Sequence, residues 1–279
     1  MPKLAKYLPL LMLFWGAATA TGQELLVPHE HHEWARFPAG SSKQVRQVTE
    51  TFKEGELIST STTTLKLRLT EVGEDFIVLE RESTSEVRGQ TFDKPKREFR
   101  SSLNNEPSNS TATVTIDGKD SLTIQGKAFP CEVRRVEIQG PTSRIVGKVF
   151  YHPGVAPFVL RREYLTSNEG SDKPEREVVS EVIALAKPYP VLTELKTVAF
   201  ILSQTTAPGE SAETVEAQCV DVPGFVVGTW TTVFDAQGQI KSRTTVELLD
   251  YQVASDSTMQ TSTRDRGLFR GKRQRATNN

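Results

Sequence analysis

The chain has 279 residues, with 34 lysines and arginines against 35 aspartates and glutamates, so its formal net charge at pH 7 is −1. Proteins dedicated to binding nucleic acid usually carry a broad basic excess, and this near-neutral balance argues against that class. The length allows one large β domain or two small ones. Threonine, serine, valine and glutamate dominate the composition, which favours strands over helices.

The first twenty residues are typical of a secretory signal peptide. Lys3 and Lys6 form a basic start, and an apolar run covers residues 7–18. That run is short for a membrane span, and Ala18-Thr19-Ala20 fits the small-x-small cleavage pattern. An uncleaved membrane anchor is the alternative. We expect residues 1–20 to be removed, leaving a protein that is exported, either periplasmic or secreted, and soluble after cleavage.

A lead segment, residues 21–36, contains three of the four histidines. His29 and His31 would share one face if this segment were a strand, which makes them weak candidates for a metal pair. The segment does not match HExxH, because Glu33 stands where the second histidine would be needed. We therefore expect a solvated lead-in, and the sequence assigns no metal ligand beyond these two candidates.

One hairpin pattern occurs three times, at residues 37–72, 155–186 and 222–251. The clearest copy is the third, which begins with a Pro-Gly entry and has a turn at residues 235–238 between two long strands. In the first copy, the odd positions of residues 57–69 are leucine, serine and threonine, with three leucines at 65, 67 and 69. The even positions of residues 58–70 are isoleucine, threonine, lysine and arginine, with Lys66 and Arg68 opposite those leucines. This is the pattern of a half-buried antiparallel strand. Closely spaced turn signals, including Asp117-Gly118, favour an all-β sheet between these copies.

The second and third copies belong to a longer repeat. Setting Val155 and Phe158 on Val222 and Phe225 gives an offset of 67 residues (222 minus 155), which relates residues 127–186 to residues 194–253. Each unit would be a four-stranded meander, and one meander cannot bury both of its faces. We expect an all-β fold with few helices over residues 37–253, in which a duplicated antiparallel meander forms a strongly curved sheet or half-barrel.

Residues 254–279 differ in composition, with Ser, Thr, Gln, Arg and Asn predominating. We interpret them as a disordered basic tail, either solvated or in contact with an anionic surface.

Cys131 and Cys219 are the only cysteines. An even count in an oxidising compartment favours a disulfide. The repeat, however, places the two residues about five strands apart, which at roughly 4.8 Å per strand exceeds 20 Å. A disulfide between them would require the sheet to curl back on itself, so both states stay open.

The motifs of common enzymes are absent from this sequence. It contains no G-x-S-x-G elbow, P-loop, dinucleotide-binding glycine run or CxxC. We therefore predict no catalytic residue and no cofactor.

One strand face has small residues at its centre, which would leave room for a ligand beneath a curved sheet. The candidate ligand-face residues are Leu57, Ser59, Ser61, Thr63, Leu65, Ile240, Ser242, Thr244 and Val246.

Three strings, HHEWARFPAGS, VAPFVLRREY and VPGFVVGTW, resemble those of uncharacterised secreted proteins from planctomycete-type bacteria. The meander over residues 37–251 resembles the curved half-barrel of the LolA/LppX-like lipoprotein-carrier superfamily. The resemblance implies carriage of a lipid or of a lipoprotein acyl chain, and it assigns no functional residue to this sequence.

The expected function is that of an exported, non-enzymatic binding or carrier protein of the cell envelope, with a lipid or other apolar ligand on the concave sheet face. Two alternatives remain. One is a structural or protein-interaction module of the envelope that holds a partner protein through its sheet edges and basic tail. The other is an exported metal-dependent hydrolase.

Overall fold

The structure is a computed structural model that describes residues 25–104, 106–107, 109–168, 170–171 and 173–255. The predicted signal peptide and all of the predicted tail beyond Ser255 lie outside these residues. The described chain has no α-helix, and none of its helical segments is long and apolar enough to cross a membrane.

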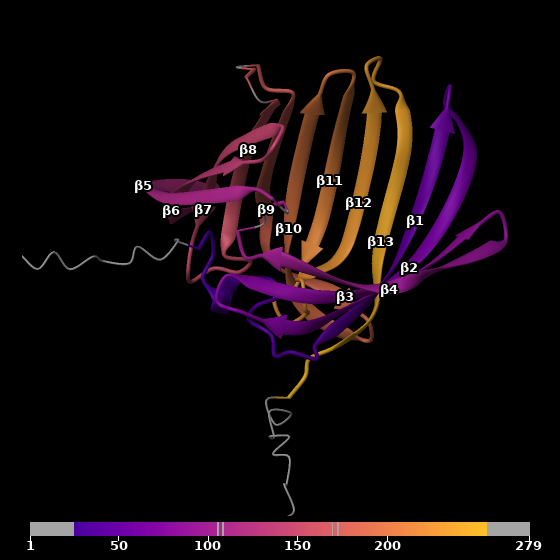
Figure 1. Ribbon diagram of the computed structural model, residues 1–279, viewed down its shortest axis with the longest axis horizontal. Helices are drawn as coiled ribbons and strands as arrows, with labels where there is room; N and C mark the ends of the chain where they lie inside the picture. Colours follow the sequence, from indigo (N-terminus) through magenta and orange to yellow (C-terminus); the bar gives the residue numbers. More distant parts are fainter. Residues whose placement is uncertain (1–24, 105, 108, 169, 172, 256–279) are drawn as a thin grey trace, which may run out of the picture.

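The described residues form a single sheet of thirteen strands, which confirms the predicted all-β class and antiparallel meander (Figure 1). Its strands are β1 (Ser42–Lys53), β2 (Glu56–Val72), β3 (Phe76–Val87), β4 (Gln90–Ser102), β5 (Thr111–Ile124), β6 (Lys127–Gln139), β7 (Ser143–Tyr151), β8 (Val159–Asn168), β9 (Arg176–Val191), β10 (Glu194–Ala207), β11 (Glu210–Gln218), β12 (Val226–Asp235) and β13 (Ile240–Gln252).

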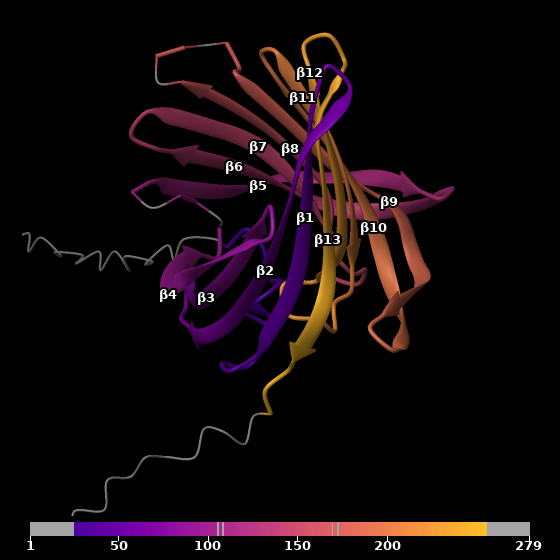
Figure 2. The ribbon, with the colours of Figure 1, turned by 90° about the vertical axis from the view of Figure 1, so that its right-hand side faces the viewer.

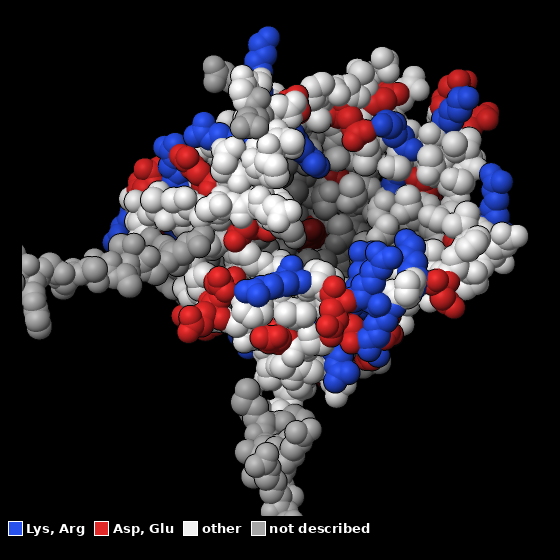
Figure 3. Space-filling view, viewed as in Figure 1, with Lys and Arg blue, Asp and Glu red and all other residues white. Residues whose placement is uncertain are grey.

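The strand order is β4-β3-β2-β1-β13-β12-β11-β10-β9-β8-β7-β6-β5. The first strand therefore pairs with the last, and the two edge strands, β4 and β5, are consecutive in the chain. The sheet curves strongly without closing into a barrel, so one of its faces is concave (Figure 2). In the space-filling view the molecule is hollowed in front of β10 and β11 (Figure 3).

The loops before β8 and β12 share a hydrogen-bond pattern at the predicted offset of 67 residues. In one loop Phe158 N–H donates to Val155 O and His152 N–H donates to Phe158 O, each over 2.8 Å. In the other, Phe225 N–H donates to Val222 O and Cys219 N–H donates to Phe225 O over the same distance. Both phenylalanines have a positive φ, of 75° and 54°. The residues that the sequence alignment pairs therefore make equivalent backbone hydrogen bonds in the two loops.

The lead segment packs on the concave side of the sheet, so the expectation of a solvated lead-in is wrong for its described part. Leu26 and Val27 are buried in one cluster with Val136, Val149 and Tyr151. Farther along the chain, Trp34 and Phe37 are buried in another cluster, against β2, β3 and Phe225. The segment thus contacts strands near both edges of the sheet.

Arg36 lies among the phenylalanines of the three hairpin copies. Its guanidinium carbon is 5.8, 5.6 and 5.7 Å from the ring centroids of Phe37, Phe158 and Phe225. His31 stacks on Phe158 with the ring centroids 4.0 Å apart. Cation–π and stacking contacts of this kind stabilise the packing by about 0.5–1 kcal/mol each where they are exposed. They hold the end of the lead segment over the repeated loops.

The sheet face that contacts the lead segment is called the inner face here. Val149 packs against Leu26 and Val27 on this face, and Arg162 is paired directly with Val149. Side chains of directly paired residues in antiparallel strands lie on the same face of the sheet. Arg162 therefore also points to the inner face, together with every residue that the register places beside it.

Candidate functional site

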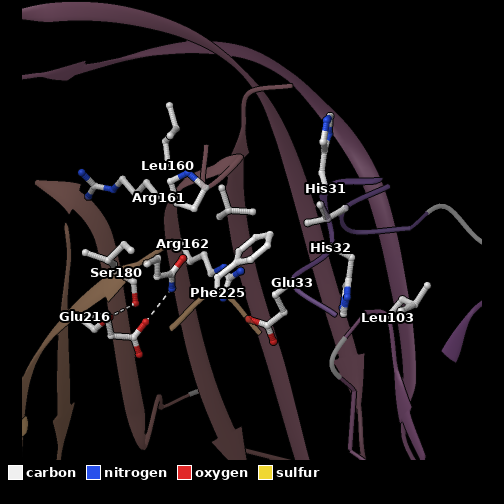
Figure 4. A pocket seen from close by; sticks show the side chains of 16 residues that line it. His31, His32, Glu33, Leu103, Leu160, Arg161, Arg162, Ser180, Glu216 and Phe225 are labelled. Atoms are coloured by element: carbon white, nitrogen blue, oxygen red, sulfur yellow. Dashed lines mark hydrogen bonds between the residues drawn. The ribbon is translucent and has the colours of Figure 1, made fainter. Parts of the chain in front are cut away.

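A cavity of about 180 Å³ lies between the lead segment and the inner face of β8 to β11 (Figure 4). The lead segment supplies Val27, His31, His32 and Glu33, and the two repeated loops supply Pro157 and Phe225. The other lining residues are Leu103, Val159, Leu160, Arg161, Arg162, Ser180, Ile201, Ser203, Glu216 and Gln218. One wall of the pocket therefore exists only because the lead segment is docked on the sheet.

His32 contributes a buried hydrogen-bond donor to the pocket. The residue is only 5% exposed, and its Nδ1 accepts the backbone N–H groups of Trp34 and Ala35, each over 3.1 Å. Burial, together with the charges of Arg162 and His29, lowers the pKa of His32 to about 4. The ring is therefore neutral at pH 7, and because Nδ1 accepts two hydrogen bonds, the ring proton is on Nε2.

The Nε2 atom of His32 has no hydrogen-bond partner within the described residues. Buried polar atoms are almost always paired, and leaving one unpaired costs about 1–3 kcal/mol. The pocket thus contains an N–H group without an acceptor.

Arg162 provides a second donor without a partner. It lies on β8 with its side chain on the inner face, and its buried Nε has no hydrogen-bond partner among the described residues. The neighbouring Arg161 extends to the opposite face, since successive strand residues alternate. There Arg161 forms ion pairs with Glu163 at 2.7 Å and Glu181 at 3.3 Å. Of two adjacent arginines, one is paired on the outer face and the other points toward the pocket.

Two carboxylates, those of Glu33 and Glu216, balance this positive charge. Glu216 accepts a hydrogen bond from Gln218 Nε2 at 2.8 Å. Behind them, Lys43 is buried, and its Nζ donates to Gly224 O over 3.3 Å. Burial lowers the pKa of Lys43, while the nearby Glu33 and Glu216 raise it. The pocket and its surroundings therefore combine the charges of Arg162 and Lys43 with those of two glutamates.

A line of hydroxyl groups crosses the inner face and ends at Arg162. We call it the hydroxyl row, and its members are directly paired from strand to strand: Ser180, Ser203, Thr214, Thr231, Thr244, Thr49 and Ser61. Ser203 Oγ donates to Ser180 Oγ over 2.8 Å, and both of these residues line the pocket. The inner face next to the pocket is thus lined with polar groups.

The ligand-face residues predicted from the sequence do not line this pocket. Ser61 and Thr244 belong to the hydroxyl row, and Ser59, Thr63, Ser242 and Val246 flank them in unbroken register on the inner face. Leu65 and Ile240 are half-buried. Leu57, near the β1–β2 turn, is 53% exposed. These residues lie on the arm of the sheet formed by β2 and β13, away from β8 to β11.

The histidine pair and the cysteines were the other candidate residues. His29 and His31 lie on a short 3₁₀ helix, η1 (His29–His31), and not on a strand. His29 Nε2 contacts Glu74 O at 2.7 Å, and His31 Nδ1 contacts the Tyr151 hydroxyl at 2.5 Å. The described residues contain no cluster of three or more His, Cys, Asp and Glu side chains suited to a metal ion.

Cys131 and Cys219 are both buried free thiols. They belong to separate core clusters. Cys131 is on β6 and Cys219 directly follows β11, five strands away in the sheet order.

Sequence reasoning did not single out His32, Glu33, Arg162 or Glu216. One signal was present for Arg162: in a strand, consecutive arginines must point to opposite faces, so one of the two had to be on the buried side. His32 and Glu33 reach the site through packing of the lead segment, and Glu216 reaches it through cross-strand register. A local sequence pattern shows neither the packing nor the register.

No family model matches the chain, and no curated protein matches it. Among solved structures, a Bacteroides fragilis protein inferred to be exported and to have a YmcC-like fold matches 77% of this chain and 98% of its own, with 10% identity and a TM-score of 0.30. An inferred lipoprotein of Parabacteroides distasonis matches 77% and 96%, with 11% identity and a TM-score of 0.34. A mutant of the Rh. blastica porin matches 75% and 99%, with 8% identity and a TM-score of 0.27.

None of these three is described as a LolA/LppX-like carrier. With TM-scores of 0.27 to 0.34, they assign no function to this chain.

Proposed function

We propose that this chain is an exported, non-enzymatic binding protein of the cell envelope that holds a small polar ligand in the pocket beneath its lead segment. The observation that carries the proposal is the pair of donors without acceptors, His32 Nε2 and Arg162 Nε, in the lining of one cavity. A ligand with acceptor oxygens would complete both. Export rests on the signal-peptide pattern of residues 1–20.

The lining of the pocket favours a polar ligand over the acyl chain expected from the sequence. A hydrocarbon chain would leave His32 Nε2 and Arg162 Nε without acceptors and would remove water from the carboxylates of Glu33 and Glu216. Burying polar groups without partners costs about 1–3 kcal/mol each, and more when they are charged. The hydroxyl row carries the same polarity onto the adjoining sheet.

The cavity volume restricts the size of the ligand. A buried cavity of about 150 Å³ accepts benzene, and the pocket here measures about 180 Å³. The ligand, or the part of it that enters the pocket, is therefore about the size of a single ring.

Native mass spectrometry of the mature protein, purified from its own envelope, tests this proposal. We expect a small-molecule adduct that is lost in Arg162→Gln, because removing one charge-assisted hydrogen bond of about 1.5–3 kcal/mol lowers affinity at least tenfold. Arg135→Gln is the matched control, since Arg135 does not line the pocket and forms its ion pair with Glu137 at 2.7 Å. Absence of any adduct, an acyl-chain adduct, or an adduct retained by Arg162→Gln would contradict the proposal.

A further inference from the structure

The pocket contains donors and acceptors together. His32 Nε2 and Arg162 Nε are N–H donors without partners, while Glu33 and Glu216 present carboxylate oxygens to the same cavity. Ionised carboxylates only accept hydrogen bonds, and a guanidinium or a neutral imidazole N–H only donates. A matching ligand must therefore accept at one side of the pocket and donate at another.

The balance of charge excludes ligands of a single sign. A carboxylate or phosphate group would satisfy Arg162 and His32 but would be repelled by Glu33 and Glu216. An amine would pair with the glutamates, but it would leave His32 Nε2 and Arg162 Nε without acceptors. The positive charge of Arg162 would also repel the amine. Like charges that are brought together out of water oppose each other strongly, because the local dielectric constant is low. An uncharged ligand meets neither penalty.

Hydroxyl groups meet both requirements, because each one can donate and accept a hydrogen bond. Several hydroxyls on one small ring would place acceptors toward His32 and Arg162 and donors toward Glu33 and Glu216. The hydroxyls of Ser180 and Ser203 offer further contacts that adapt to either role, since a hydroxyl hydrogen rotates to suit its partner.

The rest of the lining is apolar and suits the carbon face of such a ring. Phe225 lies between Arg162 and Glu33 in the close view of the pocket (Figure 4). Pro157, Val159, Leu160 and Ile201 complete the apolar part of the lining. Binding pockets generally combine apolar walls with a few placed polar groups, the former supplying contact area and the latter fixing orientation.

We propose that the ligand of this pocket is an uncharged polyhydroxylated ring the size of one sugar or cyclitol unit. This inference rests on the proposed binding function and narrows it to one chemical class. The ring is either a free small molecule or the terminal unit of a longer glycan. In the second case, the chain beyond the terminal unit has the half-buried hydroxyl row beside the pocket for further hydrogen bonds.

Saturation-transfer NMR and calorimetry on the full mature chain test the ligand class. The uncharged probes are glucose, galactose, mannose and myo-inositol, and the comparison probes are succinate, ethanolamine and octanoate. We expect at least one uncharged probe to bind and no comparison probe to compete with it. Glu216→Gln and Arg162→Gln should each weaken that binding at least tenfold, and Arg135→Gln, at an arginine of β6 outside the pocket, should change it less than twofold.

Two further comparisons separate the possible outcomes. The first comparison is between the bound sugar and an oligosaccharide that ends in it. If the oligosaccharide binds more tightly than the free sugar, and Thr231→Val removes only this difference, the natural ligand is the end of a glycan. If the two bind with equal affinity, the natural ligand is a free sugar. Binding of succinate, ethanolamine or octanoate in place of the uncharged probes would overturn the ligand class while leaving the binding function intact. If no probe binds and the purified protein carries no adduct, both proposals fail.

Discussion

At the scale of single residues, the unusual feature of this protein is a histidine whose tautomer is fixed by its own backbone. The N–H groups of Trp34 and Ala35 both point at His32 Nδ1, so protonation at that nitrogen would break two hydrogen bonds. Burial and the nearby Arg162 also oppose a positive charge on the ring. The folded state therefore holds His32 neutral, with its single N–H directed away from the backbone.

This predicts an acid-sensitive contribution to stability. The unfolded chain protonates His32 near pH 6.5 and the folded chain only near pH 4, so the contribution is complete above pH 6.5 and is lost as the pH falls toward 4. Between pH 7 and 5 the loss from this residue is about 2 kcal/mol. Urea unfolding measures the free energy of unfolding at pH 7 and at pH 5. The decrease between the two pH values should be about 2 kcal/mol smaller in His32→Asn than in wild type.

His152→Asn is the control for that measurement. His152 Nδ1 also accepts a backbone N–H, from Gly154 at 3.0 Å, but this contact is exposed. We expect the pH dependence of His152→Asn to match that of wild type. The same drop in His32→Asn as in wild type would show that His32 is not held neutral.

At the scale of elements, the lead segment and the repeated loops depend on one close contact. Gly224, in the loop before β12, has a φ of +72°, and a Cβ atom there would lie 2.7 Å from Lys43 Nζ and 2.8 Å from the Trp34 ring. Gly224 also donates its N–H to Glu33 O at 2.8 Å and accepts from Lys43 with its carbonyl. The absence of a side chain lets the lead segment lie directly on this loop.

We therefore expect Gly224→Ala to lower the free energy of unfolding by about 3 kcal/mol. Left-handed backbone alone costs an alanine about 1–2 kcal/mol, and the clash with Trp34 adds to it. Gly209→Ala separates the two effects, because Gly209 has a φ of +78° but open space around its Cβ position. Chemical denaturation of both variants should show the larger loss for Gly224→Ala, and equal losses would contradict direct packing of the lead segment on the loop.

The sequence predicted the parts of the fold that depend on local patterns. Alternation over residues 57–70 and the offset between Phe158 and Phe225 were enough to identify long strands and the duplicated loops. The turn predicted at Asp117-Gly118 was wrong, because the positive φ of Gly118 serves a bulge within the continuous strand β5.

The pocket could not be predicted in this way. Its walls meet through contacts between segments that are far apart in the chain, such as the donation of Arg134 to Leu25 O and Leu26 O. The apolar residues that bury the lead segment, including Leu26 and Trp34, are separated by histidines, glutamates and a proline, so they form neither a strand nor a helix period. Only the folded sheet provides the surface that they cover.

At the scale of the whole molecule, the open sheet leaves two strand edges, and both carry features that oppose pairing with another strand. Strand β4 contains Lys94, Pro95, Lys96 and Arg97, and a register shift lies opposite them in β3. Strand β5 has its bulge at Gly118. Lysine, proline and bulges are the usual means by which proteins block edge-to-edge association. These edges weaken the alternative in which the protein holds partners through added strands.

Removing this protection should make the protein self-associate. We expect Lys94→Val combined with Pro95→Val to restore a regular, apolar run on β4 with a backbone N–H that can pair with a second copy. Sedimentation velocity over a range of concentrations should then show a larger oligomeric fraction than in wild type. Lys66→Val combined with Thr64→Val is the matched control, because it removes the same charge on β2, at two positions that are paired with both β1 and β3. If the control variant associated as strongly as the β4 variant, the effect would come from added apolar surface and not from an exposed edge.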